Sequence, residues 1–260
     1  MIEARGITVD LGHTRVLHGI DFHARPGEVT AIVGPNGSGK TTLMRALTGE
    51  VPYGGRIEIG GLDISRAKGW ELAARRAVLP QATTLAFPFT VIEVVRMGLA
   101  SGQHGDDRHL PSRALAEVGL GGQENRFFQE LSGGEQQRAH LARVLVQVWH
   151  PVEADGPRWL LLDEPVSSLD IAHQLEVMGR ITRYARDGGG VVTVMHDLNL
   201  TALHADRIAI MAVGRLRAIG PPTEVMTDAL LSEVYGCRLR VGTAPEGAAP
   251  FILPHCAALA

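Results

Sequence analysis

A glycine-rich turn constrains the fold of this chain more than any other feature. It lies between an apolar run at residues 29–33 and a helical pattern at residues 40–48. The turn fills every position of the P-loop pattern: Gly34, Pro35, Asn36, Gly37, Ser38, Gly39, Lys40 and Thr41. Glycines allow successive backbone N–H groups to face an anion, and the start of a helix adds partial positive charge. The sequence therefore predicts a phosphate site between a strand and a helix.

The polar side chains at the end of this turn indicate what the phosphates belong to. Lys40 can reach the terminal phosphates of a nucleotide as a point charge, and the Thr41 hydroxyl is placed to bind Mg²⁺. Thr42 follows directly and can also contact the phosphates. We therefore expect ATP or a similar nucleotide, with Mg²⁺, as the ligand.

The order of apolar runs along the chain indicates an α/β fold with a mostly parallel sheet flanked by helices. Short apolar, partly β-branched runs at 29–33, 77–79, 159–162 and 191–195 have the character of buried parallel strands. Helical patterns separate them, at residues 40–48, 134–148 and 171–186. Alternation of strands and helices predicts a doubly wound core.

Two regions depart from this alternation. Residues 90–129 contain helical patterns at 91–99 and 110–118 and predict an all-helical insertion. From residue 221 onward we expect a C-terminal extension with a short helix at 229–235. Within that extension, the pieces 238–241 and 251–253 predict short strands.

A second part of the phosphate site is expected at the end of the run 159–162, where two carboxylates follow. Open α/β sheets bind ligands at the carboxyl ends of their strands. Asp163 is suited to hold Mg²⁺, together with Thr41. Glu164 is suited to orient or deprotonate an attacking water. An acidic pair after a strand is often only a helix cap, but beside a P-loop it indicates catalysis.

Composition excludes several functional classes. The 25 basic and 28 acidic residues give a formal charge of −3, and no basic run is present, which argues against nucleic acid as a partner. No run approaches the ~20 apolar residues of a membrane-spanning helix, and the first residues do not resemble a secretory signal. Two cysteines are too few for a disulfide scaffold.

The string from Leu131 to Arg138 is the most discriminating one in the sequence. Ser132, Gly133 and Gly134 can form a second anion nest at a helix start, and Ser132 with Glu135 forms a capping box. This string resembles the signature motif of the ATP-binding subunits of ABC transporters. In that family the signature binds the terminal phosphate of the ATP held by the opposite subunit. The resemblance implies a P-loop NTPase core with N-terminal antiparallel strands and a helical subdomain.

The resemblance extends over nearly the whole chain and assigns further residues. Gln81 resembles the glutamine that senses Mg²⁺ and the attacking water, and His196 resembles the switch histidine that contacts the γ-phosphate. Ser168 and Asp170 lie in a string that resembles the loop crossing the dimer interface. It implies a single ABC ATPase domain, with residues 1–89 and 130–220 as core, 90–129 as helical subdomain and 221–260 as extension. It also implies a homodimer, because one chain cannot complete a site.

One position departs from the family pattern. Most such subunits have an aromatic residue that stacks on adenine just before a glycine near the N-terminus, but here Leu11 precedes Gly12. Leu11, His13 or Val16 can pack on the base instead. We therefore expect modest selectivity for ATP over GTP.

The cargo and the location also follow from resemblance. Residues 79–81, 86–91 and 148–157 look most like those of the haemin-import subunits of bacteria, with iron-siderophore and cobalamin importers as the nearest alternatives. Such a subunit lies at the cytoplasmic face of the inner membrane. Its partners are a second copy of itself, a multi-span membrane permease and, indirectly, a periplasmic binding protein.

Two alternatives from other classes remain open at this point. The same ATPase head occurs in DNA-repair and chromosome-organising proteins, which carry long coiled-coil insertions or duplicated heads. A chain of 260 residues leaves no room for these. A P-loop kinase for small molecules is the other alternative, and the signature string argues against it.

Overall fold

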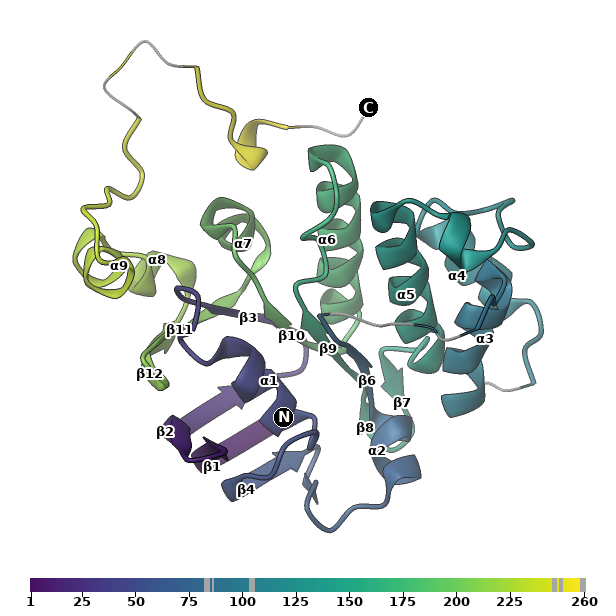
Figure 1. Cartoon of the computed structure of the whole chain (residues 1–260), viewed down its shortest axis with the longest axis horizontal. Helices are drawn as coiled ribbons and strands as arrows, with labels where there is room; N and C mark the ends of the chain where they lie inside the picture. The colour runs from purple at the N-terminus through teal and green to yellow at the C-terminus, as the bar shows by residue number, and fades with distance from the viewer. Residues whose placement is uncertain (82–84, 86, 103–105, 245–246, 248–249, 258–260) are drawn as a thin grey trace.

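The computed structural model describes residues 1–81, 85, 87–102, 106–244, 247 and 250–257. Its centre is a mostly parallel sheet with the strand order β12-β11-β3-β10-β9-β6 (Figure 1). The last strand, β12, runs antiparallel to β11, and the other neighbours are parallel. The strands span β3 Val29–Val33, β6 Arg76–Leu79, β9 Trp159–Asp163, β10 Gly190–Val194, β11 Arg207–Ala212 and β12 Arg215–Gly220.

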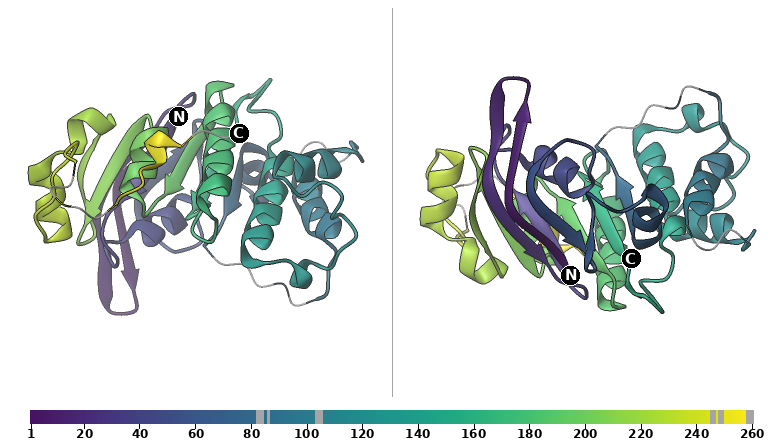
Figure 2. Two further views of the ribbon diagram at one scale, coloured as in Figure 1. Left: turned by 90° about the horizontal axis from the view of Figure 1, so that it is seen from above. Right: turned by 90° about the horizontal axis from the view of Figure 1, so that it is seen from below.

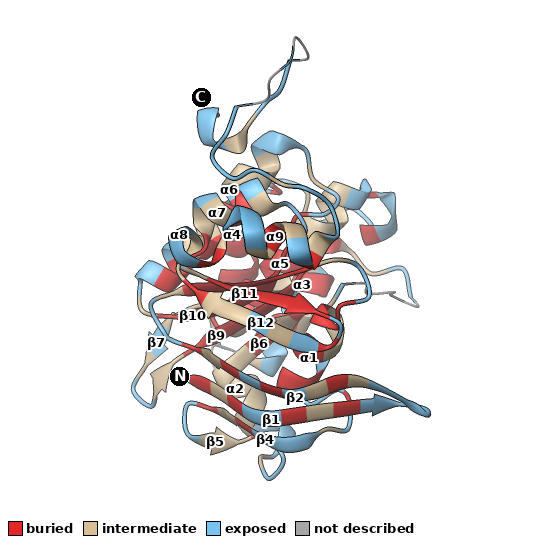
Figure 3. Cartoon of the chain, turned by 90° about the vertical axis from the view of Figure 1, so that its left-hand side faces the viewer, coloured by how far each residue is buried: buried red, intermediate tan, exposed pale blue. Residues whose placement is uncertain are grey.

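The central strands are buried on both faces, which explains their continuous apolar sequence. Every residue of β3, β9 and β10 is buried (Figure 3). Neighbouring parallel strands end at the same edge, because Leu162 pairs with Thr193 and Leu79 pairs with Leu162. Residues that follow these strands in the sequence are therefore brought to one edge of the sheet.

Helices and a second sheet cover the two faces. One face packs against α3, α5, α6 and the C-terminal helices, and the other packs against α1 and the N-terminal sheet (Figure 1). The α-helices span α1 Lys40–Leu47, α2 Gly69–Arg75, α3 Val91–Ser101, α4 Leu110–Glu117, α5 Gly133–Gln147, α6 Ile171–Arg186, α7 Leu198–His204, α8 Pro222–Val225 and α9 Asp228–Tyr235. The predicted α/β class with a mostly parallel sheet is confirmed.

The N-terminal sheet has the order β2-β1-β4-β5 and is antiparallel throughout. Its strands span β1 Ile2–Leu11, β2 Thr14–Ala24, β4 Gly54–Ile59 and β5 Leu62–Asp63. Alternate residues such as Ile2, Ile20 and Ile57 point into the core that contains α1. The β1–β2 hairpin extends beyond the main sheet (Figure 2), and the expected N-terminal antiparallel strands are confirmed.

The helices α3, α4 and α5 lie together to one side of the main sheet (Figure 2). Thr90 and Glu93 form a capping box that starts α3. Gly98 allows close contact with α5, since a Cβ there would lie 1.9 Å from the carbonyl oxygen of Arg143. A 3₁₀ turn at Phe128–Glu130 precedes α5. The segment 148–157 forms a small hairpin of β7 Val152–Glu153 and β8 Gly156–Pro157.

The C-terminal extension differs from the prediction in one respect. Helix α9 is present, but neither 238–241 nor 251–253 is a strand. The main chain of Leu239 bonds to the Ser232 hydroxyl, and the Val241 N–H donates to the Asp228 carboxylate, so side chains of α9 replace a neighbouring strand. The chain then reaches a 3₁₀ turn, η2 Pro254–Cys256, that packs on α7. Among the described residues, no helix is long and apolar enough to cross a bilayer.

Candidate functional site

The P-loop turn connects β3 to α1 and depends on its glycines. Gly34, Gly37 and Gly39 have φ of 151°, 77° and 99°, which side-chain-bearing residues rarely adopt. A Cβ at Gly34 would lie 2.2 Å from the carbonyl oxygen of Met211 on β11. The turn therefore strongly favours glycine at these positions, above all at Gly34, and it leaves the start of α1 open as an anion nest.

Lys40 opens α1 and folds back over the turn. Its side chain is buried, with the residue 6% exposed. The ammonium donates to the carbonyl oxygens of Gly34, at 2.8 Å, and Pro35, at 3.1 Å. Burial lowers the pKa of Lys40, while the negative charges of Glu164 and Asp163 raise it. The ammonium thus lies where an anionic phosphate can replace two neutral carbonyl partners.

Asp163 ends β9 beside the P-loop and is almost completely buried, at 3% exposure. Burial, followed by repulsion from Glu164, raises its pKa to about 6, whereas a hydrogen bond from Thr41 and the charge of Lys40 lower it. Within the described residues, its Oδ1 has no hydrogen-bond partner. A buried carboxylate oxygen without a donor, next to a threonine hydroxyl, fits a hard divalent cation such as Mg²⁺.

Two further residues predicted from the sequence contact one carboxylate oxygen of Glu164. Its Oε1 accepts a hydrogen bond from Gln81 Nε2 at 2.9 Å and lies 2.5 Å from His196 Nε2. Gln81 follows β6, Glu164 follows β9 and His196 follows β10. The ends of these three strands therefore bring together side chains that are far apart in the sequence. Residues 81 and 196 are separated by 115 positions.

These groups line one cavity of about 540 Å³. Its lining comprises Val16, Asn36, Gly37, Gly39, Lys40, Thr41, Thr42, Gln81, Glu164 and His196. Of the three side chains considered for packing on adenine, Val16 lines this cavity, and Leu11 and His13 do not. The cavity joins a phosphate cradle to a carboxylate, an amide and an imidazole, which are the groups that hydrolysis of a phosphoanhydride requires.

The signature string lies outside this cavity. Ser132 caps α5 by accepting from the Glu135 N–H at 3.3 Å, and the Ser132 N–H donates to the Glu135 carboxylate at 2.8 Å. The Ser132 hydroxyl also donates to the Glu135 carboxylate, at 2.8 Å, and these two bonds from the Ser132 N–H and hydroxyl lower the pKa of Glu135. Ser132 and Gly133 are exposed, and Gly134 and Glu135 are half-buried. The chain therefore has a second helix start that faces solvent and does not contact its own P-loop cavity.

The loop with Ser168 and Asp170 lies beside the signature string. A Cβ at Gly134 would lie 3.2 Å from the carbonyl oxygen of Ser168. Asp170 caps α6 by accepting from the His173 N–H at 3.0 Å. Both Ser168 and Asp170 are exposed. The exposed Ser168 and Asp170 therefore belong to a loop that lies next to the start of α5, where Ser132 and Gly133 are also exposed.

Sequence reasoning missed a contact between the signature helix and the carboxylate pair. Gln137 Nε2 donates to the main-chain carbonyl of Glu164 at 2.7 Å. Its place in the string after Ser132 is visible in the sequence, but the pairing with a carbonyl 27 residues away is not. A main-chain acceptor carries no sequence signal.

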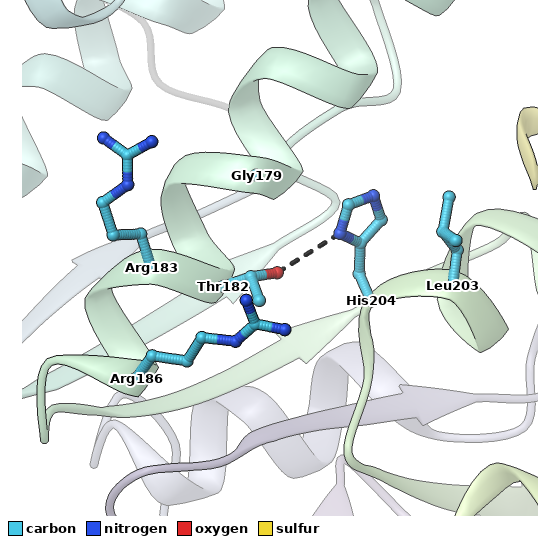
Figure 4. Close-up of a pocket in the computed structure, with 6 residues that line it drawn as sticks. All are labelled: Gly179, Thr182, Arg183, Arg186, Leu203 and His204. Atoms are coloured by element: carbon cyan, nitrogen blue, oxygen red, sulfur yellow. Dashed lines mark hydrogen bonds between the residues drawn. The ribbon is translucent and has the colours of Figure 1, made fainter. Parts of the chain in front are cut away.

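A second hollow, of about 370 Å³, lies between α6 and α7 (Figure 4). It is lined by Gly179, Thr182, Arg183, Arg186, Leu203 and His204. The Thr182 hydroxyl donates to the Met178 carbonyl at 2.8 Å and so accepts from His204 Nδ1 at 3.2 Å. Burial, with the nearby charges of Arg186 and His255, lowers the pKa of His204. The hollow contains none of the predicted site residues.

Comparison with known proteins places this geometry in a family. Residues 17–167 match the family model described as ABC transporter. The chain is 62% identical over 257 residues to the hemin import ATP-binding protein HmuV of Jannaschia sp. (strain CCS1), covering 99% of this chain and 95% of that protein. It is 61% identical over 256 residues to HmuV of Roseobacter denitrificans, covering 98% of each.

Solved structures agree on the fold. An ATP-binding subunit of an ABC transporter superposes with a TM-score of 0.78 at 22% identity, covering 91% of this chain and 98% of that one. A nucleotide-free ATP-binding cassette superposes with a TM-score of 0.76 at 23% identity, covering 90% of this chain and 98% of that one.

Proposed function

Because the chain belongs to the ABC transporter family, as an ATP-binding ATPase, we propose that it drives the import of haemin through a separate membrane permease. The proposal of haemin as the cargo rests on the 62% identity to a hemin import ATP-binding protein over 99% of this chain. A cavity with the P-loop on one wall and the carboxylate of Glu164 on another supports the hydrolytic half of the proposal.

The residues of the cavity fit ATP with Mg²⁺. The glycine turn and Lys40 would hold the phosphates, and Thr41 and Asp163 would hold the metal, with Gln81 at its edge. Support comes from the buried Oδ1 of Asp163, which lacks a donor among the described residues. When bound, Mg²⁺ neutralises charge that develops on the phosphate oxygens.

The side chains around Glu164 are proposed to carry the chemistry. Glu164 accepts a proton from the attacking water, or orients it, while the γ-phosphate is transferred. His196 holds Glu164 before ATP binds and can then turn towards the γ-phosphate. Gln81 donates to the same carboxylate oxygen and fixes its direction. Contacts of 2.9 Å or less around Oε1 support these proposed roles.

The exposed signature string supports a homodimer as the working unit. Ser132, Gly133 and Gly134 form an anion nest at the start of α5 that its own cavity does not use. In a head-to-tail dimer, this nest would meet the ATP in the partner's P-loop, with Ser168 and Asp170 at the shared interface. ATP would then favour closure, because its phosphates contact both subunits only in the closed state.

The apolar run that contains Phe87 is proposed to face the permease. Phe87 is 71% exposed and is therefore accessible to a partner. Phe89 meets Phe87 edge-on but packs against the main core. Ala86, in the same apolar run, lies outside the described residues. A permease at this place would hold the subunit at the cytoplasmic face of the inner membrane, indirectly coupled to a periplasmic binding protein.

Reconstitution tests the proposal. The chain would be purified with its multi-span membrane permease, placed in liposomes with the periplasmic binding protein, and assayed for ATP hydrolysis. Haemin should raise the ATPase rate and enter the liposomes, and the same complex with Glu164→Gln should do neither. Stimulation by an iron-siderophore or cobalamin in place of haemin would assign a different cargo. Co-purification with DNA and without a membrane protein would overturn the transport role.

A further inference from the structure

The main chain at Glu164 adopts a conformation that needs support. Its φ is +54°, a left-handed value that a residue with a side chain rarely adopts. Pro165 follows and restricts the backbone of Glu164 further. Strained backbone persists at functional sites only where surrounding contacts hold it.

Three groups supply the contacts that hold this backbone. The Glu164 N–H donates to the Val194 carbonyl at 3.2 Å. The Glu164 carbonyl accepts from Gln137 Nε2 at 2.7 Å, and from the Ser167 hydroxyl and N–H at 3.3 and 3.4 Å. Gln137 makes the shortest of these bonds. Ser167 belongs to the same turn as Glu164, whereas Gln137 comes from a separate helix.

Gln137 is held firmly at its own end. It lies in the second turn of α5, five residues after the capping Ser132. The next turns of α5 are buried in the core through Ala139, Leu141 and Ala142. A side-chain amide fixed to a packed helix can therefore set the position of the Glu164 carbonyl.

We propose that Gln137 is a positioning residue for ATP hydrolysis: its amide holds the left-handed backbone of Glu164 and thereby aims the carboxylate at the attacking water. The carboxylate and the carbonyl that Gln137 binds both belong to Glu164. A change of φ at Glu164 would therefore move Oε1 away from Gln81 and His196. This inference rests on the proposed role of Glu164 as the base, and it is independent of the cargo.

The same bond links two motifs. Gln137 and Ser132 belong to one helix, so a shift of α5 moves the signature string and the carbonyl of Glu164 together. In the proposed dimer, a shift of α5 on contact with the partner's ATP would therefore also move the Glu164 carbonyl. The bond therefore gives a physical route between the two sites of the proposed dimer.

The test compares three variants of the full chain. Gln137→Ala removes the amide, and Gln137→Met removes it while keeping a long, helix-compatible side chain. Gln147→Ala is the matched control, because Gln147 lies on the same helix, is also half-buried, and donates to the carbonyls of Ala73 and Arg76 away from the cavity. Steady-state ATP hydrolysis gives kcat, and equilibrium binding gives the Kd for ATP.

We expect both Gln137 variants to lose kcat by about tenfold or more, since small misplacements of catalytic groups have effects of that size. Their Kd for ATP should stay within about twofold of the unmutated chain. Gln147→Ala should keep kcat. In a Glu164→Gln background, Gln137→Met should cause no further loss, because the carboxylate that it positions is already absent.

Other results would overturn the proposal. Unchanged kcat in Gln137→Met, or a raised Kd with unchanged kcat, would assign Gln137 a different role. If Gln137→Met lowered kcat by the same factor in the Glu164→Gln background as in the unmutated chain, its effect would be a general disturbance of the structure. Normal turnover in Glu164→Gln alone would instead overturn the proposed base, so the two failures are distinguishable.

Discussion

His196 Nε2 lies 2.5 Å from Oε1 of Glu164. An ionised carboxylate has no proton to donate, so the imidazole is the donor in this contact. Gln81 donates to the same oxygen, and both lone pairs of Oε1 are then engaged. A water can use this oxygen as a base only after Gln81 or His196, both of which are exposed, moves away.

Glu164→Gln should stop hydrolysis and leave ATP binding intact. The amide cannot accept a proton from water, so we expect the ATPase rate to fall by about 10²–10⁴-fold. ATP should then hold the variant as a dimer, which size-exclusion chromatography with and without ATP can detect. Glu93→Gln is the control, because Glu93 is an exposed capping residue of α3, and its turnover should match the unmutated chain. A monomeric, fully active Glu164→Gln chain would contradict both the base and the dimer.

Lys40→Arg should abolish most activity although the charge is kept. The buried ammonium fits between the carbonyls of Gly34 and Pro35, where a planar guanidinium is too wide and directs its donors differently. We expect a loss of about 10²-fold in kcat/KM. The chain offers a matched control, because Lys68 is its other lysine and is exposed at the start of α2. Lys68→Arg should be unaffected, and equal behaviour of the two variants would refute the geometric argument.

Much of the fold and the cavity could be predicted because local patterns determine them. Continuous apolar runs mark strands buried on both faces, and parallel strands present their carboxyl ends at one edge. This rule already places Gln81, Glu164 and His196 near one another. Their meeting at a single carboxylate oxygen required the structure, since it depends on side-chain directions.

The parts that could not be predicted depend on the main chain or on the absence of a neighbour. Residues 238–241 alternate basic and apolar side chains as a half-buried strand does, but the side chains of Ser232 and Asp228 accept from the N–H groups of Leu239 and Val241 instead. The bond from Gln137 ends on a carbonyl, which every residue possesses. Likewise the sequence does not distinguish Leu11, His13 and Val16, and in the structure only Val16 of these three lines the cavity.

Val16→Tyr should strengthen binding of ATP. Val16 lines the cavity, and stacking of an aromatic ring on a base contributes roughly 0.5–1.5 kcal/mol. We expect the Kd for ATP to fall by roughly two- to tenfold. Leu11→Tyr is the control, since Leu11 is exposed and does not line the cavity. In the unmutated chain, discrimination between ATP and GTP should be modest, and a preference of several hundredfold in hydrolysis would show that another group recognises adenine.

Asp163→Asn should make the ligand-free chain more stable and less active. Burial raises the pKa of Asp163 from 3.8 to about 6, so the folded state binds a proton that the unfolded chain releases earlier. As pH rises from about 4 to 6, the unmutated chain therefore loses stability, and the deficit remains at higher pH. Asparagine has no charge to bury. The Tm of Asp163→Asn should therefore equal that of the unmutated chain near pH 4 and exceed it by a few degrees at pH 7.5. Thermal unfolding of both proteins across this pH range measures the difference in Tm. Added ATP with Mg²⁺ should raise the Tm of the unmutated chain only. The opposite result is that the Tm of Asp163→Asn, relative to that of the unmutated chain, falls between pH 4 and pH 7.5. It would show that the carboxylate is stabilised in the folded state.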